Sequence, residues 1–221
     1  MMKIKLEALT MIQSITELVT FDEFIDWYPE NSEHHYELHN RKIVEMPKAT
    51  GKHSKLTGFL IADLNFEIRR LQLPYFIPKE SVIKPMGEES GYEPDIIVLN
   101  EQTIGNEPRW EKSSIITMGS SVPLIVEVTS TNWEDDYARK LEAYESMGIQ
   151  EYWIVDYLGL GGRRFIGNPK QPTFSVYQLV DGEYQVKLFI NCDRIQSAIF
   201  PELNLTPEQV DLIFTIYELV N

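Results

Sequence analysis

The sequence predicts an α/β domain with a mixed central sheet flanked by helices. Three short apolar runs, at residues 94–99, 123–129 and 151–156, are rich in β-branched or aromatic side chains and are typical of buried strands. A helical pattern over residues 132–147 separates the last two runs, and a strand–helix–strand unit of this kind places its strands in parallel. Residues 174–190 have the pattern of an antiparallel hairpin, so the sheet is expected to be mixed.

The elements that precede these strands are predicted from local signals. Residues 20–23 form a capping box that opens a short helix. Residues 36–46 are expected to form two short strands. Apolar residues recur at spacings of three and four over 53–71, which predicts an amphipathic helix that Pro74 prevents from continuing. Residues 75–84 are a further predicted strand.

The remaining elements follow in chain order. The mostly polar stretch 100–122 is expected to be an excursion from the sheet. Gly148 is expected to end the helix before the third buried strand. The dipeptide Asp181-Gly182 is a strong hairpin-turn signal, and residues 206–209 open a terminal helix with a capping box that has proline at its first helical position.

Composition describes a globular protein with a sizeable core. The chain has 221 residues, 43% of them hydrophobic and 24% charged, which excludes a disordered, collagenous or coiled-coil protein. The single cysteine, Cys192, allows no intrachain disulfide. No apolar run approaches the ~18 residues that span a bilayer. We therefore expect a cytoplasmic protein with no membrane partner.

The charge balance is strongly acidic. The 20 basic and 34 acidic side chains give a formal net charge of −14 at pH 7. Such a protein repels polyanions at long range, which disfavours a protein that coats nucleic acid nonspecifically but suits one that concentrates a divalent cation. A local basic cleft is still compatible with this charge. The candidate phosphate contacts are Arg69, Arg70, Arg163 and Arg164.

Two carboxylates in apolar surroundings are the most informative side chains. Glu127 interrupts a strand expected at the centre of the sheet, and burying an unpaired carboxylate there is costly. Asp95 heads the preceding buried strand. If these strands are neighbours, both carboxylates point into one cleft, where Mg²⁺ or Mn²⁺ would relieve their repulsion. A water bound to such an ion is a potential nucleophile.

Lys140 is the third candidate. At ~100° per residue along the predicted helix, Lys140 lies at the margin of the apolar face, whereas Arg139 lies on the opposite side. An ammonium on the core side of this helix could orient a water molecule or stabilise negative charge that develops on a phosphate.

These residues together resemble a known family. The similar positions are Pro94-Asp95, Glu127-Val128-Thr129-Ser130, Asp136, Lys140, Tyr144, residues 151–156 and Tyr36-Glu37-Leu38. In this order they resemble the Uma-two family, proposed endonucleases of the restriction-endonuclease-like PD-(D/E)XK superfamily. The resemblance covers roughly residues 20–190. No internal repeat or low-complexity linker divides the sequence, so we expect a single domain over 1–221, with a nuclease-like core at about 36–190, a preface at about 1–35 and an extension at about 191–221.

The resemblance also implies roles for individual residues. Asp95 and Glu127 would be metal ligands, joined by the backbone carbonyl of Val128, and Glu37 would be a further acidic residue near the metal. The superfamily pattern places a lysine two residues after the glutamate, where this chain has Thr129. The resemblance implies that Lys140 supplies that lysine from the following helix. It thus implies a Mg²⁺- or Mn²⁺-dependent endonuclease that hydrolyses DNA with a metal-bound water, with a homodimer as one arrangement.

Two other functions fit the same residues. The chain could be a binding or assembly module that keeps the nuclease fold without activity, as the departure at Thr129 and the acidic charge both suggest. It could also be a metal-free acid–base hydrolase, such as a glycosidase that uses a carboxylate pair. The plainer interpretations pair Glu127 with a buried base and place Lys140 in an ordinary surface pair with Asp136, four residues before it. They make His53 a histidine at a helix start or core edge.

Overall fold

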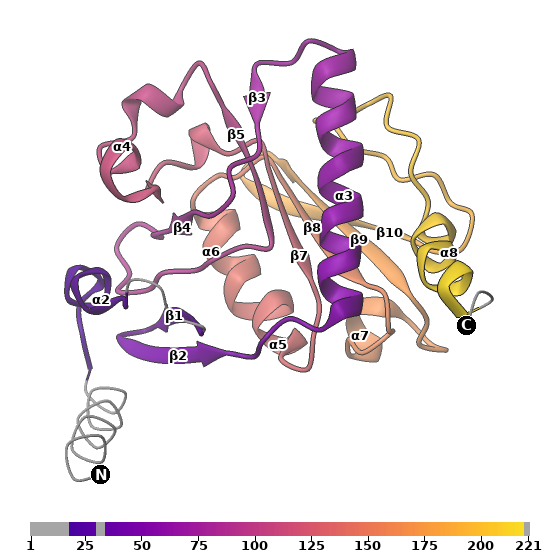
Figure 1. The fold of residues 1–221 in the computed structure, drawn as a ribbon, viewed down its shortest axis with the longest axis horizontal. Helices are drawn as coiled ribbons and strands as arrows, with labels where there is room; N and C mark the ends of the chain where they lie inside the picture. Colours follow the sequence, from indigo (N-terminus) through magenta and orange to yellow (C-terminus); the bar gives the residue numbers. More distant parts are fainter. Residues whose placement is uncertain (1–17, 30–33, 219–221) are drawn as a thin grey trace, which may run out of the picture.

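The computed structural model describes residues 18–29 and 34–218, and its centre is a six-stranded mixed sheet (Figure 1). Strands β7 and β8 run parallel, and the other neighbouring pairs run antiparallel, which confirms the predicted mixed α/β class. The strand order is β10-β9-β8-β7-β5-β3. The strands are β3 (Tyr75–Phe76), β5 (Ile96–Asn100), β7 (Leu124–Val128), β8 (Glu151–Asp156), β9 (Thr173–Val180) and β10 (Glu183–Phe189).

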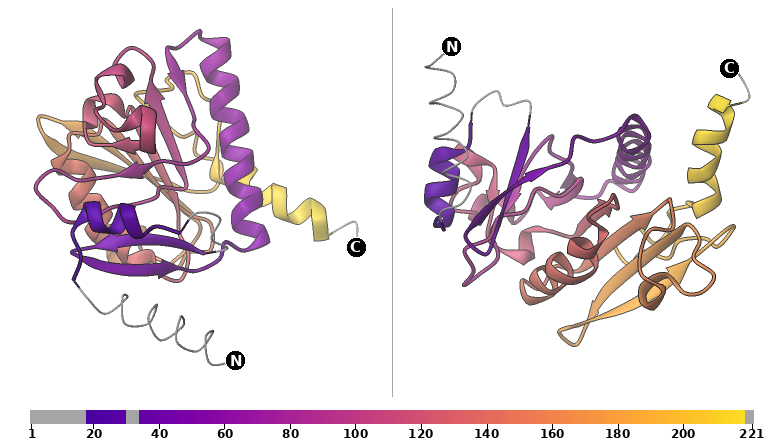
Figure 2. Two further views of the ribbon diagram at one scale, coloured as in Figure 1. Left: turned by 60° about the vertical axis from the view of Figure 1, so that its left-hand side comes forward. Right: turned by 90° about the horizontal axis from the view of Figure 1, so that it is seen from below.

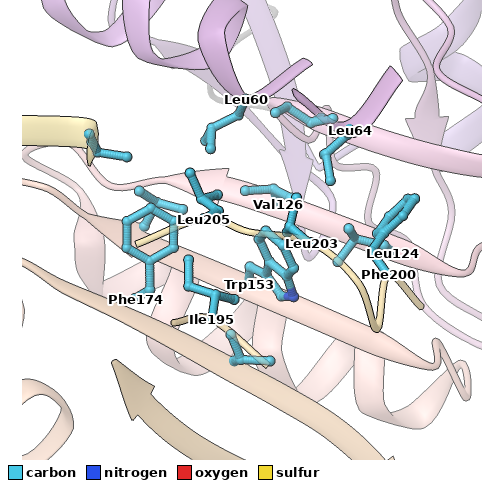
Figure 3. Packing of buried hydrophobic residues seen from close by; sticks show 14 of the residues in the cluster. Leu60, Leu64, Leu124, Val126, Trp153, Phe174, Ile195, Phe200, Leu203 and Leu205 are labelled. Atoms are coloured by element: carbon cyan, nitrogen blue, oxygen red, sulfur yellow. The ribbon is translucent and has the colours of Figure 1, made fainter. Parts of the chain in front are cut away.

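Helices cover both faces of this sheet (Figure 2). Helix α3 (Gly51–Arg70) and helix α8 (Pro207–Glu218) contribute to the hydrophobic cluster on one face. Leu60 and Leu64 of α3 lie over Val126 of β7 in this cluster (Figure 3). The even-numbered residues of β7 point to this face, so Ile125 and Glu127 point to the other.

The opposite face is covered by the helical segment that joins β7 to β8. This segment consists of α5 (Trp133–Asp135), a π-helical turn η3 (Asp136–Lys140) and α6 (Leu141–Ser146). Gly148, with φ of +75°, follows it in the left-handed conformation that ends many helices. The predicted helix therefore exists, but its middle turn is wider than an α-helix.

An N-terminal helix and hairpin lie beside the sheet. Helix α2 (Phe21–Trp27) begins with the predicted capping box, in which Thr20 and Glu23 bond to each other's backbone N–H groups. Strands β1 (His35–His39) and β2 (Lys42–Met46) form the hairpin. Residues 1–17 and 30–33 of the expected preface lie outside the described residues.

The strand expected over residues 75–84 is wrong as a single element. Instead, β3 joins the central sheet, while β4 (Val82–Ile83) pairs in parallel with β6 (Ile115–Ile116) in a separate small sheet. Pro78 lies between β3 and β4 and has no N–H to donate to a strand ladder.

The polar excursion over 100–122 contains β6 and three short helical elements. They are η1 (Ile104–Asn106), α4 (Trp110–Ser113) and η2 (Gly119–Ser121).

The chain after β8 adds the strands β9 and β10 to one edge of the sheet. After the short helix α7 (Arg163–Ile166), β9 and β10 meet at Asp181-Gly182, and both turn residues have positive φ as predicted.

The division into core, preface and extension stays a prediction. Within residues 18–29 and 34–218, no helix is long and apolar enough to cross a membrane.

We expect Leu60→Ala to lower the free energy of unfolding by about 2–5 kcal/mol, because it leaves a cavity between α3 and the sheet. Phe66→Ala is the matched control, since Phe66 lies on the same helix and is 63% exposed, and it should change stability by no more than about 0.5 kcal/mol. Urea denaturation of both variants measures the difference. Equal effects would contradict the described packing of α3.

Candidate active site

The ends of β5 and β7 bring the two predicted carboxylates to one place. The register pairs Ile96 with Val126 in antiparallel, so Asp95, one residue before β5, lies across from the last residues of β7. Asp95 Oδ2 accepts a hydrogen bond of 2.8 Å from the backbone N–H of Val128. The predicted neighbourhood of Asp95 and Glu127 is therefore present.

The Lys140 side chain is buried at the centre of a cluster of carboxylates. Its Nζ lies 3.1 Å from Glu127 Oε1, 3.0 Å from Glu37 Oε1 and 3.7 Å from Asp136 Oδ1. Lys140 is only 2% exposed, so its pair with Asp136 is a buried one and not the exposed pair of the plainer interpretation. The helix after β7 thus does carry an ammonium to Glu127.

Glu37 reaches this cluster from β1 and is fully buried. Besides its contact with Lys140, it accepts hydrogen bonds from the backbone N–H of Glu93 at 3.0 Å and contacts His39 Nε2 at 2.7 Å. Both carboxylate oxygens of Glu37 are therefore engaged. The structure places Glu37 as a partner of Lys140, and its expected role as a metal ligand stays a prediction.

Two further residues close the cluster around Glu127. Tyr144 of α6 donates a hydrogen bond of 3.0 Å to Glu127 Oε1, the same oxygen that Lys140 contacts. Thr129, where the superfamily pattern places lysine, is 1% exposed and its Oγ1 donates to Asp156 Oδ1 at 3.1 Å. The side chain of Thr129 therefore ties β7 to the end of β8.

The pKa values reflect one ammonium among several carboxylates. Burial raises the pKa of Glu127 well above its ordinary value, and the charges of Asp136, Asp95 and Glu37 raise it further against the opposing effect of Lys140. Burial lowers the pKa of Lys140, but the three carboxylates around it outweigh burial and raise the pKa overall. Lys140 is therefore charged at neutral pH.

The pKa values of the other two carboxyl groups around Lys140 shift in opposite directions. The pKa of Glu37 is lowered despite its burial, because Lys140 and His39 stabilise its charged form. The pKa of Asp136 is raised to about 7, mainly by burial and secondarily by the charges of Asp95 and Glu37. One positive charge does not neutralise the carboxylates around it, so an added proton or cation would stabilise the cluster.

His53 is a site residue that the sequence interpretation missed. It lies in the first turn of α3, where its Nε2 is 3.1 Å from the Val128 carbonyl oxygen and 3.3 Å from Asp95 Oδ2. Burial lowers its pKa, but the contacts with Asp95 and Val128 outweigh burial and raise it overall. The face it shares with Leu56 and Leu60 was a usable signal, because that face packs on the sheet beside the end of β7.

Asp136 is the second residue to which sequence analysis assigned no role. It is 5% exposed and opens the π-helical turn η3, whose last residue is Lys140. π-Helical turns occur frequently at functional sites. An α-helical pattern read from sequence alone does not reveal this widened turn.

A cleft of about 550 Å³ opens above this cluster. Its floor includes Glu37, Asp95, Glu127, Asp136 and Lys140, and His53 also lines it.

The four candidate phosphate arginines lie away from the cleft, because none of them lines it. Arg70, for example, pairs with Glu67 and Glu202.

The donor atoms on this floor suit a hard divalent cation. No group of three acidic, histidine or cysteine side chains within residues 18–29 and 34–218 is arranged to hold a metal ion. Asp95, Glu127 and the Val128 carbonyl nevertheless offer two carboxylates and one neutral oxygen. Mg²⁺ is commonly held by one or two carboxylates together with waters and substrate phosphates, so this donor set fits the ion without a third side chain.

The mixed sheet, with carboxylates at the adjoining ends of β5 and β7, is typical of the restriction-endonuclease-like class of nuclease folds. The structure resembles a crystal structure described as a "putative nuclease belonging to DUF820" from Anabaena variabilis ATCC 29413, with a TM-score of 0.66 and 21% identity. The similarity covers 87% of this chain and 97% of that one, which shows a shared fold.

Residues 21–208 match the model of the Uma2 family, described as "Putative restriction endonuclease". The chain therefore belongs to the Uma2 family, as its sequence resemblance predicted. A search of the curated proteins found no match.

We expect Asp136→Asn to change how stability depends on pH. The pKa of Asp136 is raised from 3.8 to about 7 in the folded protein, so the folded state keeps a proton that the unfolded chain releases. The stability that this proton provides is complete below about pH 4 and is lost as the pH rises through about 7. Urea denaturation in EDTA should therefore show a smaller loss for Asp136→Asn than for the wild type.

Asp135→Asn is the control for that comparison. Asp135 precedes Asp136 directly but lies more open to solvent and pairs with Arg139. Asp135 is the smallest of the charges that raise the pKa of Asp136, so this variant should reduce the wild-type slope between pH 4 and 7 much less than Asp136→Asn does. Identical slopes for all three proteins would contradict the electrostatic description of the cluster.

Proposed function

We propose that this protein is a metal-dependent endonuclease that hydrolyses phosphodiester bonds in DNA. The observation that carries the proposal is the arrangement of Asp95 and Glu127 at adjoining strand ends, with the Lys140 ammonium 3.1 Å from Glu127. Membership of the Uma2 family supports the nuclease class. A cytoplasmic location is proposed because the single cysteine, Cys192, suits a reducing compartment.

Asp95, Glu127 and the Val128 carbonyl would hold Mg²⁺ or Mn²⁺. When bound, such an ion would polarise a phosphate oxygen and lower the pKa of a water molecule. Burial and the neighbouring carboxylates raise the pKa of Glu127 and the pKa of Asp136, so the charged forms of both groups lack a compensating positive charge, which supports this assignment. A cation would let these carboxylates ionise together.

Lys140 would stabilise negative charge that develops on the phosphate. Its ammonium is held by Glu37 and Glu127 at a fixed place on the floor, and a charge fixed in a water-poor site needs no reorganisation during the reaction. Glu37 and Tyr144 would then position Lys140 and Glu127. This division of roles gives Lys140 the function that a lysine at the position of Thr129 would have.

A second candidate is a binding module that keeps the fold without hydrolytic activity. The observation that favours it is the internal pairing of the site. Lys140 and Tyr144 both contact Glu127 Oε1, and His53 lies against Asp95 and Val128. A cation would have to compete with these contacts, so activity has to be measured directly.

We expect cleavage of single-stranded circular DNA or supercoiled plasmid that needs Mg²⁺ or Mn²⁺ and stops in EDTA. Glu127→Gln and Lys140→Met should each slow cleavage at least ~100-fold, which corresponds to about 2.7 kcal/mol of transition-state stabilisation. Glu142→Gln and Arg139→Met are matched controls on the exposed side of the same helical segment and should keep the wild-type rate. Cleavage by Glu127→Gln at the wild-type rate would refute the assignment, and metal-independent cleavage would favour the acid–base alternative.

We also expect Mg²⁺ to stabilise the folded protein. A ligand that binds the folded state alone raises the free energy of unfolding by about 2.7 kcal/mol at 100 times its Kd. Thermal denaturation over a range of MgCl₂ should therefore show a rising Tm for the wild type and for Glu142→Gln. Asp95→Asn and Glu127→Gln should not show this rise. A parallel rise in all four proteins would place the ion elsewhere.

A further inference from the structure

The walls of the cleft differ in character from its floor. The floor is charged and buried, with Glu127, Asp136 and Lys140 each no more than 5% exposed. The walls include apolar side chains from two separate segments. These are Met46, Pro47 and Ala49 between the end of β2 and the start of α3, and Tyr157, Leu158 and Leu160 after β8.

The wall after β8 is held in a defined shape. Asp156 is fully buried, and its carboxylate accepts hydrogen bonds from the N–H groups of Leu160 at 2.9 Å and Gly161 at 2.7 Å. Lys170 Nζ donates to the Leu160 carbonyl at 2.9 Å. Leu158, which lines the cleft within this fixed loop, is 53% exposed. A large apolar side chain is therefore presented to whatever enters.

We propose that the strand bound in this cleft is unpaired DNA, with one nucleotide inserted so that its base lies against the apolar walls and its phosphate reaches the floor. The inference rests on the proposed nuclease function, since that function brings DNA to the floor. Nucleotides that leave the base stack are commonly held in pockets between aromatic or apolar side chains. Leu158 would be the main contact for the base.

The size of the cleft supports a single nucleotide. A volume of about 550 Å³ falls in the range of pockets that enclose one small molecule. The carboxylates that would act on the phosphate lie at the bottom of this space. A duplex would have to present its backbone there without entering, whereas an unpaired strand can fold one nucleotide inward.

The charges along the cleft also disfavour a duplex. Lys48 and Lys79 lie on its lining, but Lys79 pairs with Glu80 at 2.7 Å, and Glu93 lines the same space. A duplex carries one phosphate charge per ~1.7 Å of axis and is bound mainly through basic residues. Contacts between bases and apolar side chains add affinity that does not depend on phosphate charge, and only a strand with unpaired bases can make them inside a cleft.

The test compares three forms of one labelled oligonucleotide: single-stranded, fully paired, and paired except for a short central bubble. In Mg²⁺ we expect the single strand and the bubble to be cut at least ~10-fold faster than the full duplex, with cuts confined to unpaired positions. Fluorescence anisotropy in EDTA should show tighter binding of the single strand. Equal or faster cutting of the full duplex, or equal binding of both forms, would overturn the inference.

The two proposals can fail separately. If no DNA is cut but the single strand still binds more tightly than the duplex, the nuclease function fails and the inference about unpaired DNA stands. If the duplex is cut as fast as the single strand, the nuclease function stands and the inference fails. Absence of binding to every form overturns the inference.

A charge on the cleft wall tests the contact itself. Leu158→Asp should weaken single-strand binding roughly 10-fold, because it replaces the apolar contact with a base by a charge near phosphate. Leu212→Asp is the matched control, since Leu212 is 50% exposed on α8 and does not line the cleft. Circular dichroism confirms that both variants fold. Equal single-strand affinity of the two variants would overturn the role of Leu158.

Discussion

The buried ammonium of Lys140 is the constraint on which the candidate site depends. It joins the N-terminal hairpin to a distant part of the sequence, since it contacts Glu37 of that hairpin, Glu127 of the central strand β7 and Asp136 of its own helical segment. Removing one partner from a buried ion pair leaves an uncompensated charge and is strongly destabilising. The hairpin is therefore part of the site, because its glutamate helps to hold the lysine in place.

The same cluster has one ammonium for three carboxyl groups, and this imbalance connects structure to chemistry. Burial alone would make the carboxylates hold protons, which would leave them poor ligands. A divalent cation would replace those protons and restore the charged forms. His53 contacts two of the three proposed metal ligands, Asp95 and the Val128 carbonyl. Metal binding would therefore have to rearrange or share the contacts of this histidine.

Sequence reasoning found the elements that local signals specify. Residues 151–156 coincide with β8, and Asp181-Gly182 forms the predicted turn, because strand composition and turn geometry act over a few residues. It treated residues 75–84 wrongly as one strand, since the partners that separate β3 from β4 are distant in sequence. It brought Asp95 and Glu127 together because alternation along neighbouring strands fixes their direction. It missed His53, whose position depends on how α3 packs on the sheet.

The central claim is that the charge imbalance at Asp95 and Glu127 is resolved by a divalent cation. Anomalous X-ray diffraction from crystals soaked in Mn²⁺ tests it most directly, because the signal locates the ion independently of activity. The account predicts a peak bonded to both carboxylates and to the Val128 carbonyl oxygen, with His53 moved away from that oxygen. A cleft without such a peak at saturating Mn²⁺, with Glu127 still bonded to Lys140 and Tyr144, would contradict it.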